Sequence, residues 1–60
     1  MENEIKKWAV DQFKIMAGKN NLKLNLSDMQ AVREIAIKKF GYMMYVFNQV
    51  AEAFKEFNNK

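Results

Sequence analysis

The first third of the chain carries apolar residues at the spacing of an amphipathic α-helix. Over residues 3–17 they gather on one broad arc of a helical projection, and charged residues share the narrow remainder. The arc consists of Ile5, Trp8, Ala9, Val10, Phe13, Ile15, Met16 and Ala17. Gly18 follows, and glycine suits the left-handed residue that commonly ends a helix. The pattern predicts a helix over residues 3–17 that contacts more than one neighbouring helix.

Residues 19–26 change period and alternate polar with apolar side chains. One side of such an extended segment carries leucines and the other carries polar residues, namely Leu22, Leu24 and Leu26 against Asn21, Lys23 and Asn25. A strand here needs a second strand to pair its backbone groups, most simply from another copy of the chain. Without that partner, we expect residues 18–26 to form an extended loop whose leucines fill the core.

A second helix is predicted to begin at Ser27. Ser27 and Gln30 have the spacing of a capping box, in which each side chain bonds the backbone amide of the other residue. Downstream, apolar residues recur three or four positions apart, in a heptad-like pattern with one irregularity beside Gly41. They are Met29, Val32, Ala36, Phe40, Met43, Phe47, Val50, Phe54 and Phe57. This pattern predicts helix over residues 27–58.

Gly41 is the position at which this long helix is kinked or broken, if it is not continuous. A glycine inside a helix costs about 1 kcal/mol relative to alanine, which a well-packed helix tolerates. A third helix starting after Gly41 would have a poor beginning, because no Pro, Asp, Ser or Asn follows to cap it. We therefore favour one continuous helix and an all-α helical hairpin, with a three-helix bundle as the alternative.

Helix continuity has a consequence for the oligomeric state. A helix of about 31 residues spans about 46 Å, whereas one of about 15 residues spans about 22 Å and covers only half of it. The uncovered half would be aromatic, and soluble monomers rarely expose so large an apolar patch. The continuous helix therefore predicts a dimer in which two hairpins form a helical bundle. The broken helix predicts a monomer.

Composition places the chain among small globular proteins. Its 60 residues suit a single helical domain, and half of them are apolar while 28% are charged, unlike a disordered segment. The uncharged run of residues 40–51 is shorter than the roughly 20 apolar residues that cross a bilayer, so we expect no membrane span. No secretory signal is recognisable at the start of the sequence, so a cytoplasmic, intracellular location is the expectation.

The inventory of reactive side chains predicts that the protein is not an enzyme. The sequence has no histidine, cysteine or threonine, and its one serine, Ser27, is expected to cap a helix. Glu52 and Glu56 lie one helical turn apart, but a hard cation needs more oxygen ligands than one such pair supplies. The two glycines are too far apart for a phosphate-binding loop. We expect no metal site, no cofactor and no small-molecule substrate.

An interaction module is the function that the sequence favours. An apolar, aromatic and methionine-rich helical surface, without catalytic residues beside it, is typical of a small adaptor, inhibitor or assembly subunit. We call its residues the predicted seam: Phe40, Met43, Met44, Phe47, Val50, Phe54 and Phe57. The expected partner is a second copy of the chain or another protein.

DNA binding is the alternative function. The order of an alternating segment, a helix, a glycine and another helix over residues 22–57 resembles the ribbon-helix-helix repressors. That resemblance implies a dimer whose polar ribbon residues enter the major groove, here Asn21, Lys23 and Asn25. Residues after Gly41 lack the polar helix start of that family, and a full helix precedes the ribbon. Three helices also resemble homeodomain-like folds, but the last helix would carry only Lys55 as a basic residue before the terminal Lys60.

Overall fold

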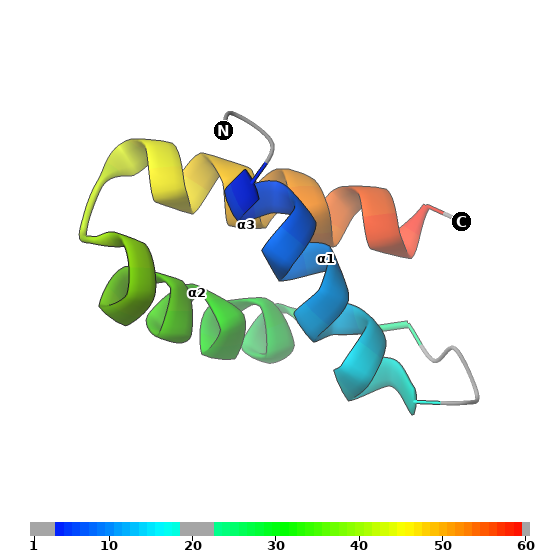
Figure 1. Ribbon diagram of the computed structural model, residues 1–60. Coiled ribbons are helices and arrows are strands. Elements are labelled where there is room, and N and C mark those ends of the chain that lie inside the picture. Colours follow the sequence, from blue (N-terminus) through cyan, green and yellow to red (C-terminus); the bar gives the residue numbers. More distant parts are fainter. Residues whose placement is uncertain (1–3, 19–22, 60) are drawn as a thin grey trace.

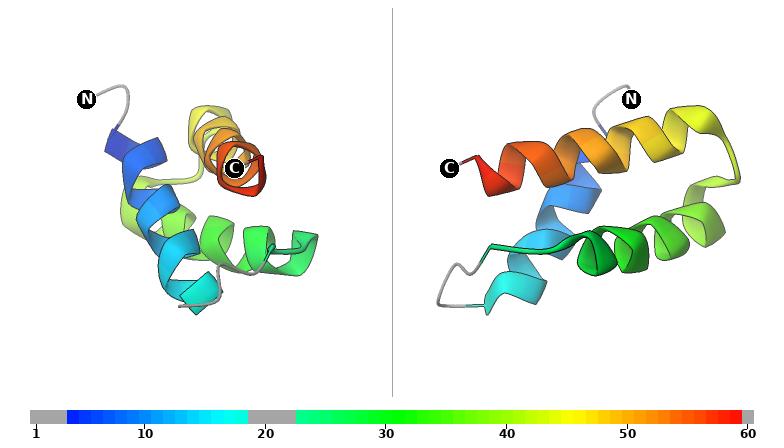
Figure 2. Two further views of the ribbon diagram at one scale, coloured as in Figure 1. Left: turned by 90° about the vertical axis from the view of Figure 1, so that its right-hand side faces the viewer. Right: turned by 180° about the vertical axis from the view of Figure 1, so that it is seen from behind.

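The structure is a computed structural model that describes residues 4–18 and 23–59, and these residues form three helices and no strand (Figure 1). The helices are α1 (Glu4–Ala17), α2 (Leu26–Phe40) and α3 (Met44–Asn58). Figure 2 shows α2 and α3 running antiparallel beside each other, with α1 crossing the same side of both. The hairpin is therefore made by α2 and α3, and α1 packs across it.

Helix α1 forms where the sequence predicts it, but buries a narrower face than expected. Its buried residues are Ile5, Ala9, Phe13 and Ala17, which lie four positions apart. Ile15 and Met16, which the projection assigned to the apolar arc, are exposed instead. The Phe13 ring packs between the rings of Phe54 and Phe57, with centroids 5.6 and 6.4 Å away. This contact joins α1 to the carboxyl-terminal half of α3.

The capping box of α2 lies two residues earlier than predicted. Asn25 is the N-cap, and its side chain accepts a hydrogen bond from the Asp28 amide at 3.1 Å. The Asp28 carboxylate in turn accepts one from the Asn25 amide at 2.9 Å. The predicted pairing of Ser27 with Gln30 is wrong, because asparagine and serine cap helices equally well and Asp28 can return the reciprocal bond. The Ser27 hydroxyl instead donates to the Asn25 side chain at 2.6 Å.

The connection between α1 and α2 is tied to the end of α3. Gly18 has the left-handed φ of 69° expected of a residue that ends a helix. The backbone amide of Leu24 donates to the Asn58 side-chain oxygen at 3.2 Å, and the Asn58 side-chain nitrogen donates to the Leu24 carbonyl at 3.0 Å. The Leu24 side chain packs against the core as predicted, and Leu22 lies outside the described residues. The prediction is wrong for Leu26, which is 64% exposed and forms the first residue of α2.

The chain turns at Gly41, so the continuous helix that we favoured over residues 27–58 is wrong. Gly41 has φ 112° and ψ 161°, a backbone conformation that is essentially restricted to glycine. Its amide still donates to the Ile37 carbonyl at 2.9 Å, which ends α2. Helix α3 then begins at Met44, and its N-cap residue, Met43, supplies no side-chain hydrogen bond. The three-helix alternative fits this arrangement.

A poor cap is tolerated at α3 because tertiary packing outweighs it. The missing N-cap bond is worth about 1 kcal/mol, whereas each buried valine contributes roughly 1.5–3 kcal/mol. The core gathers side chains from all three helices: Ile5, Ala9, Phe13, Val32, Ala36, Val46, Val50 and Ala53. Folding back at Gly41 therefore allows α3 to bury an apolar face against α1 and α2 within one chain.

The buried face of α3 differs from the predicted one. The innermost residues of α3 are Val46, Val50 and Ala53, and only Val50 belongs to the predicted seam. The prediction continued the phase of α2 through Gly41, but a new helix that starts after a turn sets its own phase. Phe54 and Phe57 consequently flank the core instead of lying at its centre.

Candidate interaction surface

The structure separates the predicted seam into three environments. Val50 is fully buried, while the four phenylalanines of the seam, Phe40, Phe47, Phe54 and Phe57, are partly buried. Met43 and Met44 are 50% and 70% exposed. Phe40, Val50, Phe54 and Phe57 thus belong to the internal core or pack against it, whereas Met43 and Met44 face outward.

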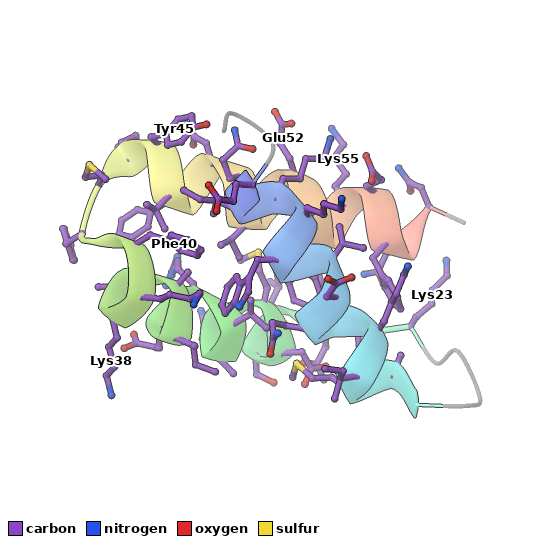
Figure 3. The ribbon with its side chains drawn as sticks, viewed as in Figure 1. Lys23, Lys38, Phe40, Tyr45, Glu52 and Lys55 are labelled. Carbon is purple, nitrogen blue, oxygen red and sulfur yellow. The ribbon has the colours of Figure 1, made fainter. Side chains whose placement is uncertain are left out.

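Four consecutive large side chains are exposed where α2 turns into α3. Tyr42, Met43, Met44 and Tyr45 are 77%, 50%, 70% and 43% exposed, and we call these four residues the apolar tip. They lie at one end of the molecule, at the left in Figure 1, and Figure 3 labels Tyr45 and the neighbouring Phe40 there. Scattered exposed apolar residues are ordinary, but a contiguous group of them marks an interaction site.

The local backbone explains why these side chains are exposed. Gly41 places residues 42 and 43 in a short connection outside both helices, and the first buried residue of α3 is Val46. The two remaining tip residues, Met44 and Tyr45, occupy the first turn of α3 before its buried face begins. The turn that lets α3 reach the core therefore leaves the tip on the outside.

Two stacks of aromatic and cationic side chains lie next to the apolar tip. In the first, the Tyr42 ring meets the Phe47 ring edge-on at 5.2 Å, and the Arg33 guanidinium lies 5.4 Å from the Phe47 centroid. This stack joins the connection to α2 and α3, and each contact has geometry expected to be favourable. The Tyr42 ring is therefore held against Phe47 of α3.

The second stack lies at the end of α2 and includes α1. The Trp8 ring meets the Phe40 ring edge-on at 5.4 Å, and the Lys39 ammonium lies 5.6 Å from the Phe40 centroid. Trp8 and Phe40 are partly buried against the core. The end of α2 is thereby held against α1, one residue before the turn at Gly41.

The residues around the tip carry positive charge. Arg33, Lys38 and Lys39 lie on the last two turns of α2, and the first turn of α3 has no acidic residue. Glu34 lies one turn before Lys38, but no ion pair joins them. Within residues 4–18 and 23–59, the one ion pair is between Lys6 and Glu56. Arg33, Lys38 and Lys39 therefore have no carboxylate partner in the described part of the chain, and Lys38 points away from the tip (Figure 3).

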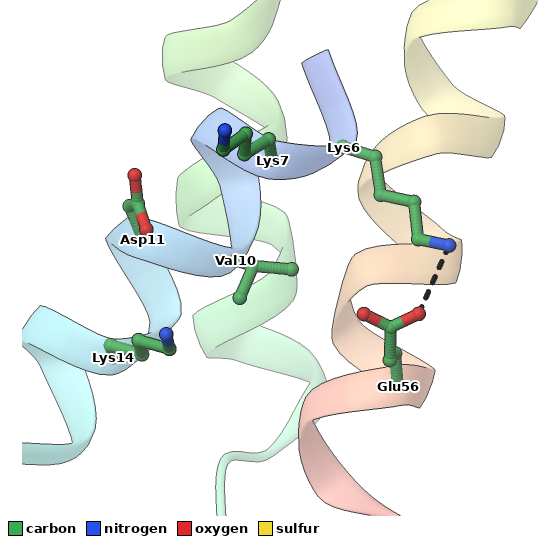
Figure 4. Close-up of a pocket in the computed structure, with 6 residues that line it drawn as sticks. All are labelled: Lys6, Lys7, Val10, Asp11, Lys14 and Glu56. Atoms are coloured by element: carbon green, nitrogen blue, oxygen red, sulfur yellow. Dashed lines mark ion pairs between the residues drawn. The ribbon is translucent and has the colours of Figure 1, made fainter. Parts of the chain in front are cut away.

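A polar groove lies on the surface along the boundary between α1 and α3, away from the tip (Figure 4). It encloses about 330 Å³ and is lined by Lys6, Lys7, Val10, Asp11, Lys14 and Glu56. The Lys6 ammonium lies 3.0 Å from the Glu56 carboxylate, and that hydrogen bond, aided by the carboxylate charge, raises the pKa of Lys6. Charges of both signs line an open surface here, which is the arrangement of a solvated helix boundary.

The structure describes two of the three residues assigned to DNA contact under the alternative function, and neither lies in a strand. Asn21 lies outside the described residues, and Lys23 is exposed in a segment without helix or strand. Asn25 is engaged in capping α2. Residues 23–25 form no strand.

The predicted seam includes Met43 and Met44, which were expected to be covered, and it omits Tyr42, which is exposed beside them. The available signal was the position of four large uncharged side chains directly after a glycine, where a turn would expose all of them. It was outweighed by the heptad-like spacing that runs through Gly41. None of the described helices is both long enough and apolar enough to cross a membrane.

No protein-family model, curated protein or solved structure matches this chain.

Proposed function

We propose that the chain is a non-enzymatic protein-interaction module and that the apolar tip is its binding surface. The observation that supports this is the exposure of Tyr42, Met43, Met44 and Tyr45 side by side, at 43% to 77% each. A protein of this size gains little from leaving four large side chains in water. A partner that covers them would remove that unfavourable hydration.

The composition of the tip suits binding to another protein. Tyrosine is enriched at the centres of protein interfaces because its ring is apolar and its hydroxyl can still bond. Methionine is flexible and polarizable, so Met43 and Met44 can adapt to the shape of a partner. Full burial of one such side chain contributes roughly 1.5–3 kcal/mol before the costs of association are subtracted. Micromolar binding, about 8 kcal/mol, is therefore a reasonable expectation.

We take the monomer as the acting form of this module. The dimer expected from the sequence depended on a continuous second helix whose aromatic half α1 could not cover. With the turn at Gly41, Phe54 and Phe57 pack against Phe13 inside one chain, so that reason for dimerisation disappears. What remains uncovered is the smaller apolar tip.

Site-specific photo-crosslinking in the cells that produce the protein tests this proposal. A benzophenone amino acid at Met44 is compared with the same group at Lys55, an exposed position about 16 Å further along α3. We expect a crosslinked product of discrete mass from position 44 only, and its loss when Tyr42→Ser is added. The same products from both positions, or none from position 44, would show that the tip is not a binding surface.

A further inference from the structure

The charged side chains nearest the apolar tip are positive. The Lys39 ammonium lies against Phe40, and Arg33 lies against Phe47, which meets the Tyr42 ring. Lys38 is exposed on the same turn of α2 as Lys39, but its side chain points away from Tyr45 (Figure 3). Between Glu34 and Glu52 the sequence contains no acidic residue. An approaching partner therefore meets an apolar surface with cations beside it, and these cations are not neutralised by the described part of the chain.

A second copy of the chain is poorly matched to this surface. A twofold dimer through the tip would bring Arg33 and Lys39 of one copy close to the same cations of the other. Like charges placed opposite each other oppose association, and the net charge of +3 on each copy adds to that repulsion. Charge complementarity therefore disfavours self-association through the tip.

A lipid surface is also a poorer match than a protein. Anionic headgroups would attract the lysines, but insertion of the tip would carry non-helical backbone and the start of α3 toward the hydrocarbon. Met43 provides no side-chain cap there, and unpaired backbone groups in lipid cost several kcal/mol each. A protein partner can supply carboxylate or carbonyl oxygens to such groups.

From these observations we infer that the apolar tip binds an acidic, amphipathic segment of a partner protein. This inference deepens the proposed function and rests on it. Apolar side chains of the segment cover Tyr42 and Met44, and its Asp or Glu residues pair with Arg33 and Lys39. Binding of this kind combines a buried apolar contact with salt-sensitive pairing at its margin.

Selection from a random peptide library displayed on phage tests the inference without knowledge of the natural partner. The whole chain is the bait, and enriched peptides are synthesised and their affinities measured by fluorescence anisotropy. We expect the enriched peptides to combine apolar residues with an excess of Asp and Glu, and to bind more weakly as salt is raised. Enrichment of neutral or basic peptides, or no enrichment above background, would overturn the inference.

Two double substitutions that change the net charge equally show whether binding depends on the cations beside the tip or only on the net charge of the protein. Arg33→Glu with Lys39→Glu reverses charge beside the tip, whereas Lys23→Glu with Lys55→Glu does so at exposed positions elsewhere. We expect the first to weaken binding of the selected peptides by about tenfold, or 1.4 kcal/mol, and the second by much less. Equal losses in both variants would mean that only net charge matters.

A further pair of variants tests the apolar part of the contact. Tyr42→Ser with Met44→Ser should abolish peptide binding, and Ile15→Ser, at a 72% exposed position on α1, should leave it unchanged. Binding to phosphatidylserine vesicles tests a lipid surface as the occupant, and a sedimentation series tests a second copy of the chain. Tip-dependent vesicle binding or tip-dependent dimerisation would replace the acidic segment as the occupant.

The failure of this inference can be distinguished from failure of the proposed function. If photo-crosslinking at Met44 captures a partner but the selected peptides are neutral or basic, the tip is a binding surface of different charge preference. If crosslinking at Met44 does not differ from that at Lys55, the tip is not a binding surface and both proposals fail.

Discussion

The Phe13 ring on α1 meets the Phe54 ring on α3 edge-on, with centroids 5.6 Å apart. Phe13 is fully buried, whereas Phe54 is partly exposed at the edge of the core. The contact links the first helix to the last, and it could not form if residues 27–58 were one straight helix with α1 beside its first half. It is therefore a marker of the three-helix arrangement.

Phe13→Ala should lower the free energy of unfolding by more than Phe47→Ala. Loss of a fully buried phenylalanine costs about 3–5 kcal/mol, which is comparable with the whole stability of a domain of this size. Phe47→Ala should cost less, because Phe47 is only partly buried. Urea denaturation followed by circular dichroism measures both, with the milder Phe13→Leu if the alanine variant does not fold. A larger loss for Phe47 would contradict the observed packing of α3.

Gly41→Ala distinguishes the turn from a continuous helix by the sign of its effect. At φ 112° and ψ 161° an alanine is strained by about 1–3 kcal/mol, so we expect destabilisation. In a continuous helix the same change would stabilise by about 1 kcal/mol. Thermal and urea unfolding give the sign directly, and a stabilised variant would restore the continuous helix. Gly18→Asn is the control, because asparagine tolerates the left-handed φ of 69° at that position.

Asn25→Ala should destabilise α2 by about 0.5–2 kcal/mol, because Asn25 accepts the hydrogen bond from the Asp28 amide. Ser27→Ala should change the stability by less than about 0.5 kcal/mol, since Ser27 is exposed and does not cap the helix backbone. The two variants are compared by urea unfolding. The reverse order would place the helix start at Ser27, as the sequence pattern suggested.

Sedimentation equilibrium over a concentration series should give the mass of a monomer, 7.1 kDa. The physical reason is that α3 buries its apolar face within the chain and that cations lie beside the exposed tip. A dimer that persists at low concentration and is dissociated by Met44→Ser would show that the tip binds a second copy. A dimer unaffected by that substitution would point to another surface.

The ion pair between Lys6 and Glu56 should make stability depend on alkaline pH. Since the pKa of Lys6 is raised in the folded state, its contribution is fully present below the ordinary lysine pKa and is lost as pH rises through the raised value. We expect the stability difference between the natural chain and Glu56→Gln to be small and to vanish over that range. Urea midpoints measured at successive pH values provide the test. A difference that grows with pH would contradict the assigned cause.

The sequence by itself determined the existence of the first helix, its end at Gly18, and the all-helical character of the described residues. These features follow from local signals, namely a strong apolar period over residues 3–17 and a glycine directly after it. The start of α2 was predicted to within two residues. The choice between Asn25 and Ser27 as cap was not decided, because both residue types satisfy the same local rule.

Only the tertiary structure decided the turn at Gly41, the buried face of α3 and the position of the apolar tip. Local chemistry favoured a continuous helix because nothing after Gly41 caps a new one. Burial of Val46, Val50 and Ala53 against residues distant in the sequence outweighs that missing cap. Such burial depends on where α1 crosses α2 and α3, which no periodicity within one segment can specify. The same turn that completes the core exposes Tyr42, Met43, Met44 and Tyr45.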